Sequence, residues 1–348
     1  MNSAQYVRVP TLFPAAARAG RKVAVVTAKE KLRDIFAQGL VRKPGEPELG
    51  HGGGIAFSSE KASQARLASH GIEEVEALVG KPTPAIYSGD ASLYVLWAGV
   101  ALLQQGKADF LYLSTTDFMQ HKHAPEAPEA VEFYAGIDVA LGQLLELNAI
   151  VGLTADHGMN AKQRPDGSPN VIYVESELTR KFGPGFRVIL PITDPYVVHH
   201  GALGSFAVVY LPPGTTARRR GTIRRCLEEM EGVTEVYGPE AADRLELPAD
   251  RLGDMVVLSG RNVVLGRTPD YHDLKAIASG LRSHGGRYEE MVPFLFSEPL
   301  GQDHAMRAAG DPRNFDLFDF LCNGGTDRPT AAAEPRTLAT GGHSFQPA

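Results

Sequence analysis

The sequence predicts an α/β protein, with a mostly parallel sheet covered by helices on both faces and an inserted α+β cap. Three observations lead to this prediction. Short apolar runs alternate with helical patterns in the first half of the chain, which is typical of a parallel sheet buried on both faces. Near Arg164 the sequence pattern changes, and closely spaced strands around one basic helix are predicted from there on. Near Asp273 the chain returns to the core.

The core elements follow in order along the chain. Val23–Val26 is an apolar run typical of a buried strand, and a helix over 29–38 follows it. The next predicted elements are a helix over 94–105, a strand over 109–113, a helix over 128–147 and a strand over 149–153. In the long helix, the residues at helical spacing are Val131, Tyr134, Ile137, Asp138, Leu141, Leu144 and Leu145.

The cap is predicted as a small β-α-β-β unit. Its elements are strands over 206–211, 233–236, 255–258 and 263–265 and a basic helix over 216–230. The predicted division of the chain is a core over 1–163, an inserted cap over 164–272, a return to the core over 273–322 and a disordered tail over 323–348.

Composition excludes several classes of protein. Lys and Arg total 35 against 41 Asp and Glu, a net charge of −6, which gives no reason to expect nucleic-acid binding. Two cysteines, Cys226 and Cys322, are too few for a cysteine zinc site. No run of about 18 apolar residues and no signal peptide are seen, so we expect no membrane span and a cytoplasmic location. The expected partner is a small-molecule substrate, with a homodimer possible.

Two predicted strands are followed by metal-ligand residue types. Asp117 and His121 come after the strand over 109–113, and a helical turn there would place both on one face. The alternative is a helix-capping Asp beside a surface His. Asp156 and His157 directly follow the strand over 149–153. A turn explains the Asp but not the adjacent His. A catalytic zinc usually has three protein ligands, so His284, in a glycine-rich loop after the cap, becomes a candidate third ligand.

The order of these motifs resembles the metal-binding order of the alkaline phosphatase superfamily and, within it, the phosphonoacetate hydrolase family. The resemblance covers about Met1–Leu321. Its most discriminating stretches are Val23–Arg33, Ile55–Ala62, Thr115–Ala130 and Ile189–Ser205. It implies an alkaline-phosphatase-like fold and a two-zinc site that splits phosphonoacetate into acetate and phosphate.

The resemblance also implies residue roles. Asp117, His121 and His284 would hold one zinc ion, and Asp156 and His157 would help to hold the other. Lys29 and Lys31 would bind the anionic ends of the substrate; without the resemblance, they would be taken as exposed lysines at a helix start. No family motif falls on His199 and His200, which are interpreted as loop residues.

In that family an Asp ligand, a nucleophilic Thr and an Asn precede the segment that matches the region from Tyr6 onward. We therefore predict that this chain contains five of the seven metal-ligand positions that the family uses. These include all the ligands of one zinc ion, and no catalytic residue is predicted. A truncated product or a mis-assigned start would explain this pattern. Two alternatives to phosphonoacetate hydrolysis are a related phosphodiesterase or phosphatase, and a non-catalytic remnant that binds zinc.

Overall fold

The chain forms two compact units, each with its own strands. The computed structural model describes residues 6–42, 53–191, 201–277 and 280–326. The first unit comprises Met1–Ala149 and Ala155–Pro293, and the second comprises Ile150–Thr154 and Phe294–Ala348. The predicted limits of the core, the cap and the tail stay a prediction. No helix in the described part of the chain has the length and apolar character needed to cross a membrane.

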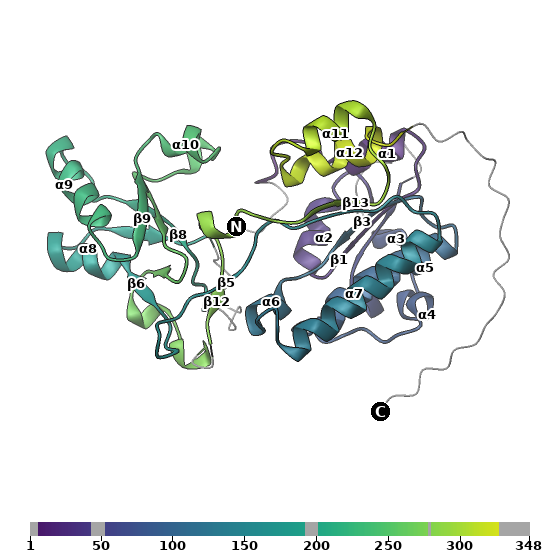
Figure 1. Ribbon diagram of the computed structural model, residues 1–348, viewed down its shortest axis with the longest axis horizontal. Coiled ribbons are helices and arrows are strands. Elements are labelled where there is room, and N and C mark those ends of the chain that lie inside the picture. The colour runs from purple at the N-terminus through teal and green to yellow at the C-terminus, as the bar shows by residue number, and fades with distance from the viewer. Residues whose placement is uncertain (1–5, 43–52, 192–200, 278–279, 327–348) are drawn as a thin grey trace. The chain divides into compact units, whose positions relative to one another are not determined.

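A parallel sheet of three strands lies in the first unit, in the order β2-β1-β3 (Figure 1). These strands are β1 (Val23–Thr27), β2 (Ile55–Ser58) and β3 (Phe110–Ser114). The central strand β1 is buried along its whole length, as expected for an apolar run covered on both faces. The strands predicted over 23–26 and 109–113 are confirmed to within one residue at each end, whereas β2 was not predicted.

Helices cover both faces of this sheet. Val23 and Val25 pack in one hydrophobic cluster, Ala24 and Val26 in another, because alternate residues of a strand point to opposite faces. The helices of this part are α1 (Leu12–Arg18), α2 (Glu30–Phe36), α3 (Leu67–His70), α4 (Val75–Val79), α5 (Gly89–Gln104), α6 (Phe118–Lys122) and α7 (Pro128–Glu146). The predicted fold class is confirmed.

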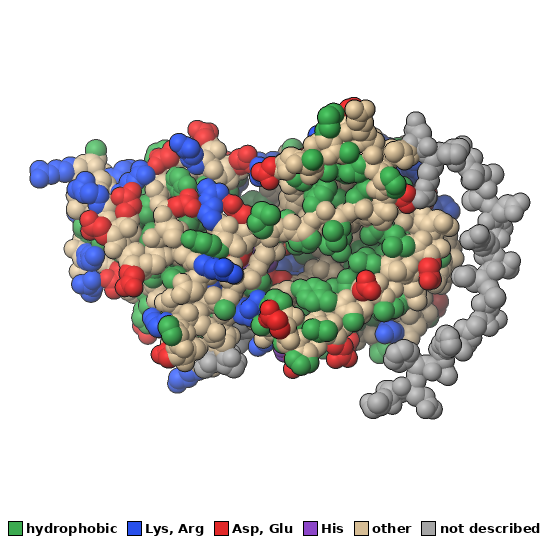
Figure 2. Space-filling view, viewed as in Figure 1, with side chains coloured by type: hydrophobic (Ala, Val, Ile, Leu, Met, Phe, Trp, Pro, Cys, Tyr) green, Lys and Arg blue, Asp and Glu red, His purple; other side chains and the backbone are tan. Residues whose placement is uncertain are grey.

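The long helix α7 buries a different set of residues from those at the predicted spacing. Its buried residues are Ala130, Phe133, Ala140 and Leu144. Val131 is 56% exposed, and Tyr134 and Leu145 are exposed as well. Figure 2 shows hydrophobic side chains on the visible face over this helix. Of the residues at the predicted spacing, only Leu144 is buried. Two of the other buried positions are the small residues Ala130 and Ala140, and α7 packs against α5.

This difference predicts that substitutions on the two sides of α7 change stability by unequal amounts. Leu144→Ala is expected to lower the free energy of unfolding by about 2 kcal/mol or more, because it opens a cavity. Val131→Lys is expected to change it by less than about 0.5 kcal/mol, because Val131 is exposed. Urea unfolding of the two variants measures both effects. Equal losses would show that the described packing of α7 is wrong.

A four-stranded antiparallel sheet with two helices follows in the chain. Its order is β7-β8-β10-β9, made of β7 (Arg187–Ile189), β8 (Phe206–Tyr210), β10 (Met255–Ser259) and β9 (Val233–Tyr237). The helices α8 (Val174–Phe182) and α9 (Ala217–Glu228) pack on it around a cluster that includes Leu178, Ile223 and Leu227. The predicted β-α-β-β order is confirmed. The strand predicted over 263–265 is β11 (Val264–Gly266), which instead pairs with β6 (Val171–Tyr173).

The second unit contains the strand that was predicted over 149–153. This strand is β4 (Gly152–Thr154), and it pairs antiparallel with β13 (Phe294–Phe296). We expected it in the parallel sheet, but an apolar pattern does not specify the partner of a strand. The helices α11 (Gln302–Ala308) and α12 (Leu317–Asn323) complete this unit. The remaining elements are β5 (Asn160–Ala161), β12 (Arg282–Ser283) and α10 (Ala241–Arg244) in the first unit, and single 3₁₀ turns in both units.

Candidate metal centre

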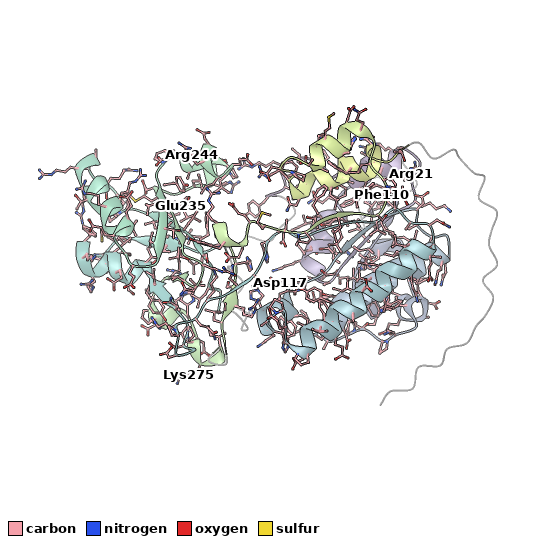
Figure 3. All side chains as sticks on the ribbon, in the orientation of Figure 1. Arg21, Phe110, Asp117, Glu235, Arg244 and Lys275 are labelled. Carbon is pink, nitrogen blue, oxygen red and sulfur yellow. The ribbon has the colours of Figure 1, made fainter. Side chains whose placement is uncertain are left out.

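Asp117 lies just beyond the carboxyl end of β3, at the point where α6 begins. Figure 3 shows Phe110 and Asp117 at opposite ends of this strand. Asp117 occupies the N-cap position of α6, yet its side chain makes no capping hydrogen bond. Its Oδ2 atom lies 3.0 Å from Nε2 of the buried His121, one helical turn later. The predicted arrangement of both side chains on one face is present, and the capping alternative is not.

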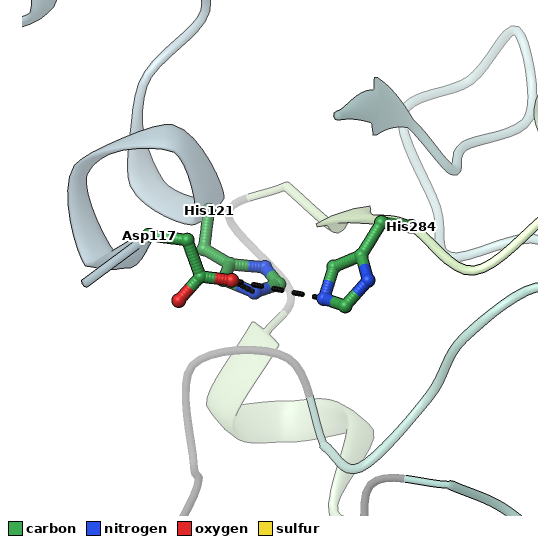
Figure 4. Close-up of side chains that lie close together, drawn as sticks. All are labelled: Asp117, His121 and His284. Atoms are coloured by element: carbon green, nitrogen blue, oxygen red, sulfur yellow. Dashed lines mark ion pairs between the residues drawn. The ribbon is translucent and has the colours of Figure 1, made fainter. Parts of the chain in front are cut away.

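Two further histidines face the same carboxylate. Nε2 of His284 lies 3.6 Å, and Nε2 of His157 lies 3.8 Å, from Oδ2 of Asp117. Ligand atoms of Asp117, His121 and His284 all lie within 4.8 Å of one another, so these three residues could hold a metal ion (Figure 4). One carboxylate and two imidazoles form a donor set that zinc accepts.

A short strand pair brings His157 and His284 together. β5 follows His157, β12 precedes His284, and the two strands pair antiparallel with Ser283 opposite Asn160. The two imidazole rings stack with their centroids 3.5 Å apart and their planes 4° apart. Asp156 lies at the rim of the cluster, with its side chain 87% exposed and its Oδ1 atom 3.6 Å from Nε2 of His157. All five predicted metal residues therefore meet in one place.

Backbone carbonyl groups orient two of the imidazoles. Nδ1 of His121 lies 2.7 Å from the carbonyl oxygen of Arg282, and Nδ1 of His157 lies 2.9 Å from that of Gly158. A carbonyl oxygen can only accept, so each Nδ1–H donates, and Nε2 is the ring atom that is turned toward Asp117 and could bind a cation. A hydrogen bond from Nδ1–H to a backbone carbonyl is typical of histidines that bind a metal ion through Nε2. The residues therefore fit a divalent metal ion.

The electrostatics of the cluster also favour a cation. Burial, together with the neighbouring rings of His157 and His121, lowers the pKa of His284 to about 3. Burial opposes ionisation of Asp117, but its hydrogen bond and the nearby imidazoles hold the pKa of that carboxyl well below its usual range. Near pH 7, therefore, His284 is neutral and Asp117 is ionised, the forms in which both bind metals.

The same shift predicts how the stability of the metal-free chain depends on pH. The pKa of His284 is lower in the folded chain, about 3, than its ordinary value of 6.5. The unfolded chain therefore binds the extra proton first, and stability is lost as the pH falls from about 6.5 toward 3. Urea unfolding in a chelator should show a shallower loss over this range for His284→Asn. An unchanged slope would contradict this prediction.

The structure places Lys29 and Lys31 at the same edge of the sheet as Asp117. Thr27 of β1 lies opposite Ser114 of β3, and the amide of Ala28 donates to the carbonyl oxygen of Ser114 at 2.8 Å. Lys29 occupies the N-cap position of α2, and both lysines are half-buried. Carboxyl ends of parallel strands form the usual binding edge of an α/β sheet.

His199 and His200, with most of the stretch Ile189–Ser205, lie outside the described residues. No pattern in the sequence selected Lys162 and Glu289, which form a buried ion pair beside the cluster. No motif surrounds either of them, and the pair forms only when β5 and β12 meet.

Comparison with known proteins identifies the family. The family model for type I phosphodiesterase/nucleotide pyrophosphatase matches residues 97–286. The chain belongs to this family. It is also similar to two solved structures of phosphonoacetate hydrolase from Sinorhizobium meliloti 1021, in complex with phosphonoformate and with phosphonoacetate. Both are 46% identical, with TM-scores of 0.83 and 0.82, and each match covers 93% of this chain and 76% of that enzyme. The predicted resemblance is confirmed, and this family member is a hydrolase.

Proposed function

We propose that this protein hydrolyses the carbon–phosphorus bond of phosphonoacetate, giving acetate and phosphate, at a centre for two zinc ions. The observation that carries the proposal is the cluster of Asp117, His121 and His284 in a chain 46% identical to phosphonoacetate hydrolase. In the reaction the bond between phosphorus and the methylene carbon breaks. The oxygen of water ends on phosphorus. One of its protons ends on the carbon, which becomes the methyl group of acetate, and the other stays with the phosphate.

Each zinc ion has its own proposed ligands. Asp117, His121 and His284 would hold the first ion, whereas Asp156 and His157 would supply part of the site for the second. A pair of zinc ions bound there would stabilise the charge that develops on the oxygens around phosphorus. The chain itself supplies the orientation: the carbonyl oxygen of Arg282 holds the ring of His121 by its Nδ1–H.

Lys29 and Lys31 are proposed to bind the two anionic ends of phosphonoacetate. The residue between them, Glu30, is engaged elsewhere: its Oε2 atom accepts from Ser58 Oγ at 2.6 Å, and its Oε1 atom lies 3.7 Å from Arg33. The acidic side chain of this segment is therefore bound to other parts of the fold. Two ammonium groups, two residues apart, suit a substrate with a phosphonate at one end and a carboxylate at the other.

The test compares substrates on the zinc-loaded protein. Release of phosphate from phosphonoacetate, and none from a nitrophenyl phosphate diester, is the expected result. The family model favours the second candidate, a phosphodiesterase, and the reverse preference would support it. Zinc binding without turnover of either substrate would support the third candidate, a non-catalytic protein that binds zinc.

Lys29→Ala is expected to weaken the binding of phosphonoacetate by about tenfold or more, because a charge-assisted hydrogen bond to an anion is lost. Calorimetric titration of the zinc-loaded protein measures this effect without requiring turnover. Lys107→Ala is the matched control. Lys107 is exposed and lies just before β3, whereas Asp117 lies beyond the other end of that strand. Equal affinities of the Lys29 variant and the control would remove Lys29 from the site.

A further inference from the structure

A buried ion pair lies beside the metal cluster. The side chains of Lys162 and Glu289 are 0% and 1% exposed, and Nζ lies 2.9 Å from Oε1. Lys162 uses its other two protons as well: it donates to Ser205 Oγ at 2.7 Å and to the carbonyl oxygen of Arg261 at 2.8 Å. An ammonium group has three donors, so its hydrogen bonds fix it in one position.

Glu289 is held in the same complete way, and its partners belong to both ligand-bearing loops. Oε1 also accepts from Asn160 Nδ2 at 2.6 Å, and Oε2 accepts from the amide of Gly286 at 3.0 Å. The backbone carbonyl oxygen of Glu289 accepts from the amide of Gly158 at 2.7 Å. Gly158 is the residue after His157, and Gly286 is two residues after His284.

Ser205 connects Lys162 to the backbone of His284 through two hydrogen bonds. Its hydroxyl accepts from Lys162, and its amide donates to the carbonyl oxygen of His284 at 2.8 Å. The loop after His284 contains Gly285 at φ +105°, a conformation that L side chains rarely adopt. The local sequence therefore does not specify the conformation of this loop, and contacts with its surroundings must determine it.

We propose that Glu289, with Lys162, is a positioning residue that fixes His157 and His284 relative to each other for metal binding. This inference deepens the proposed function and rests on its metal centre. Among the hydrogen bonds described here, Glu289 and Lys162 make none to the five metal residues; they act through Gly158, Gly286 and Ser205. Metal affinity depends on ligand placement to a fraction of an ångström, and loss of an outer-shell partner typically costs about 10- to 100-fold.

The alternative is that the pair only stabilises the fold. A half-buried carboxylate in the same unit, Glu175, provides the control. Oε2 of Glu175 accepts from the amide of Val188 at 2.8 Å and from Arg267 at 3.3 Å, in the part of the chain around the antiparallel sheet. Glu175→Gln should lower stability without displacing His157 or His284.

The experiment measures Co²⁺ dissociation constants by visible absorbance and thermal unfolding of the metal-free protein. The test variant Lys162→Met/Glu289→Met removes both charges and keeps the volume, which is often tolerated in a core. Asn160→Ala removes the hydrogen bonds that the amide donates to Glu289 Oε1 and to the carbonyl oxygen of Tyr288 and the one that it accepts from Arg261 Nε. It keeps the Lys162–Glu289 ion pair, so it supplies a second folded variant. The expected result is Co²⁺ affinity about 10- to 100-fold weaker for the double variant and a smaller loss for Asn160→Ala. Glu175→Gln should bind within about twofold of the wild type, inside ordinary context variation.

Each of the other outcomes overturns either the positioning role or the metal centre itself. If the double variant, or Asn160→Ala where the double variant does not fold, binds Co²⁺ as the wild type does, the positioning role is overturned while the metal centre stands. Losses of affinity that merely follow stability, so that Glu175→Gln loses as much, also overturn it. A wild-type chain that binds no Co²⁺ overturns the proposed centre, and this inference falls with it.

Discussion

Asp117→Asn is expected to abolish tight metal binding. Oδ2 of Asp117 lies 3.0, 3.6 and 3.8 Å from the Nε2 atoms of three histidines, so this one carboxylate faces every imidazole of the cluster. An amide of the same size keeps the shape but removes the negative charge that balances the cation. The expected loss of affinity is at least about 10³-fold, beyond the 10- to 100-fold typical of an outer-shell partner. His284→Ala should act in the same direction, because it removes one of the three proposed ligands.

The measurement is the zinc content per chain after gel filtration, followed by calorimetric titration. His123→Ala is the matched control. His123 is half-buried, and its Nδ1 atom lies 3.6 Å from Glu129 rather than from the cluster. The control should retain the zinc content of the wild type. Unchanged zinc in Asp117→Asn or His284→Ala would show that the ligand assignment is wrong.

Lys162→Met is expected to lower the free energy of unfolding of the metal-free chain by about 3–5 kcal/mol. The substitution leaves the carboxylate of Glu289, 1% exposed, without its counter-ion. Ser205 Oγ and the carbonyl oxygen of Arg261 also lose a donor. Breaking a buried pair from one side costs more than removing both partners, because the remaining charge cannot return to water.

Urea unfolding in a chelator isolates this effect from metal binding. Lys107→Met, on an exposed lysine, should change stability by less than about 0.5 kcal/mol. Lys162→Met/Glu289→Met should recover most of the loss. A double variant as unstable as the single one would indicate that the hydrogen bonds of the pair, rather than its charge balance, stabilise the fold.

The sequence by itself determined two strands of the parallel sheet and its long helices, and it selected the residues that meet in the candidate metal cluster. Apolar runs such as Val23–Val26 must be buried on both faces, so a sheet covered by helices follows from them. Asp117 and His121 share a face because a helical turn separates them, a local relation that spacing alone specifies. The family resemblance came from such local motifs, and the comparisons confirm it.

Tertiary structure alone decided which strands pair, which face of α7 is buried, and what holds the ligands in place. The pairing of β4 with β13, and of β5 with β12, depends on packing between segments far apart in the chain. Helical spacing in α7 predicted one buried stripe, but packing in the fold buried Ala130, Phe133 and Ala140 instead, together with Leu144 from that stripe. The partnership of Lys162 and Glu289 has no local pattern, because a buried charge is stabilised only by the partner that folding brings to it.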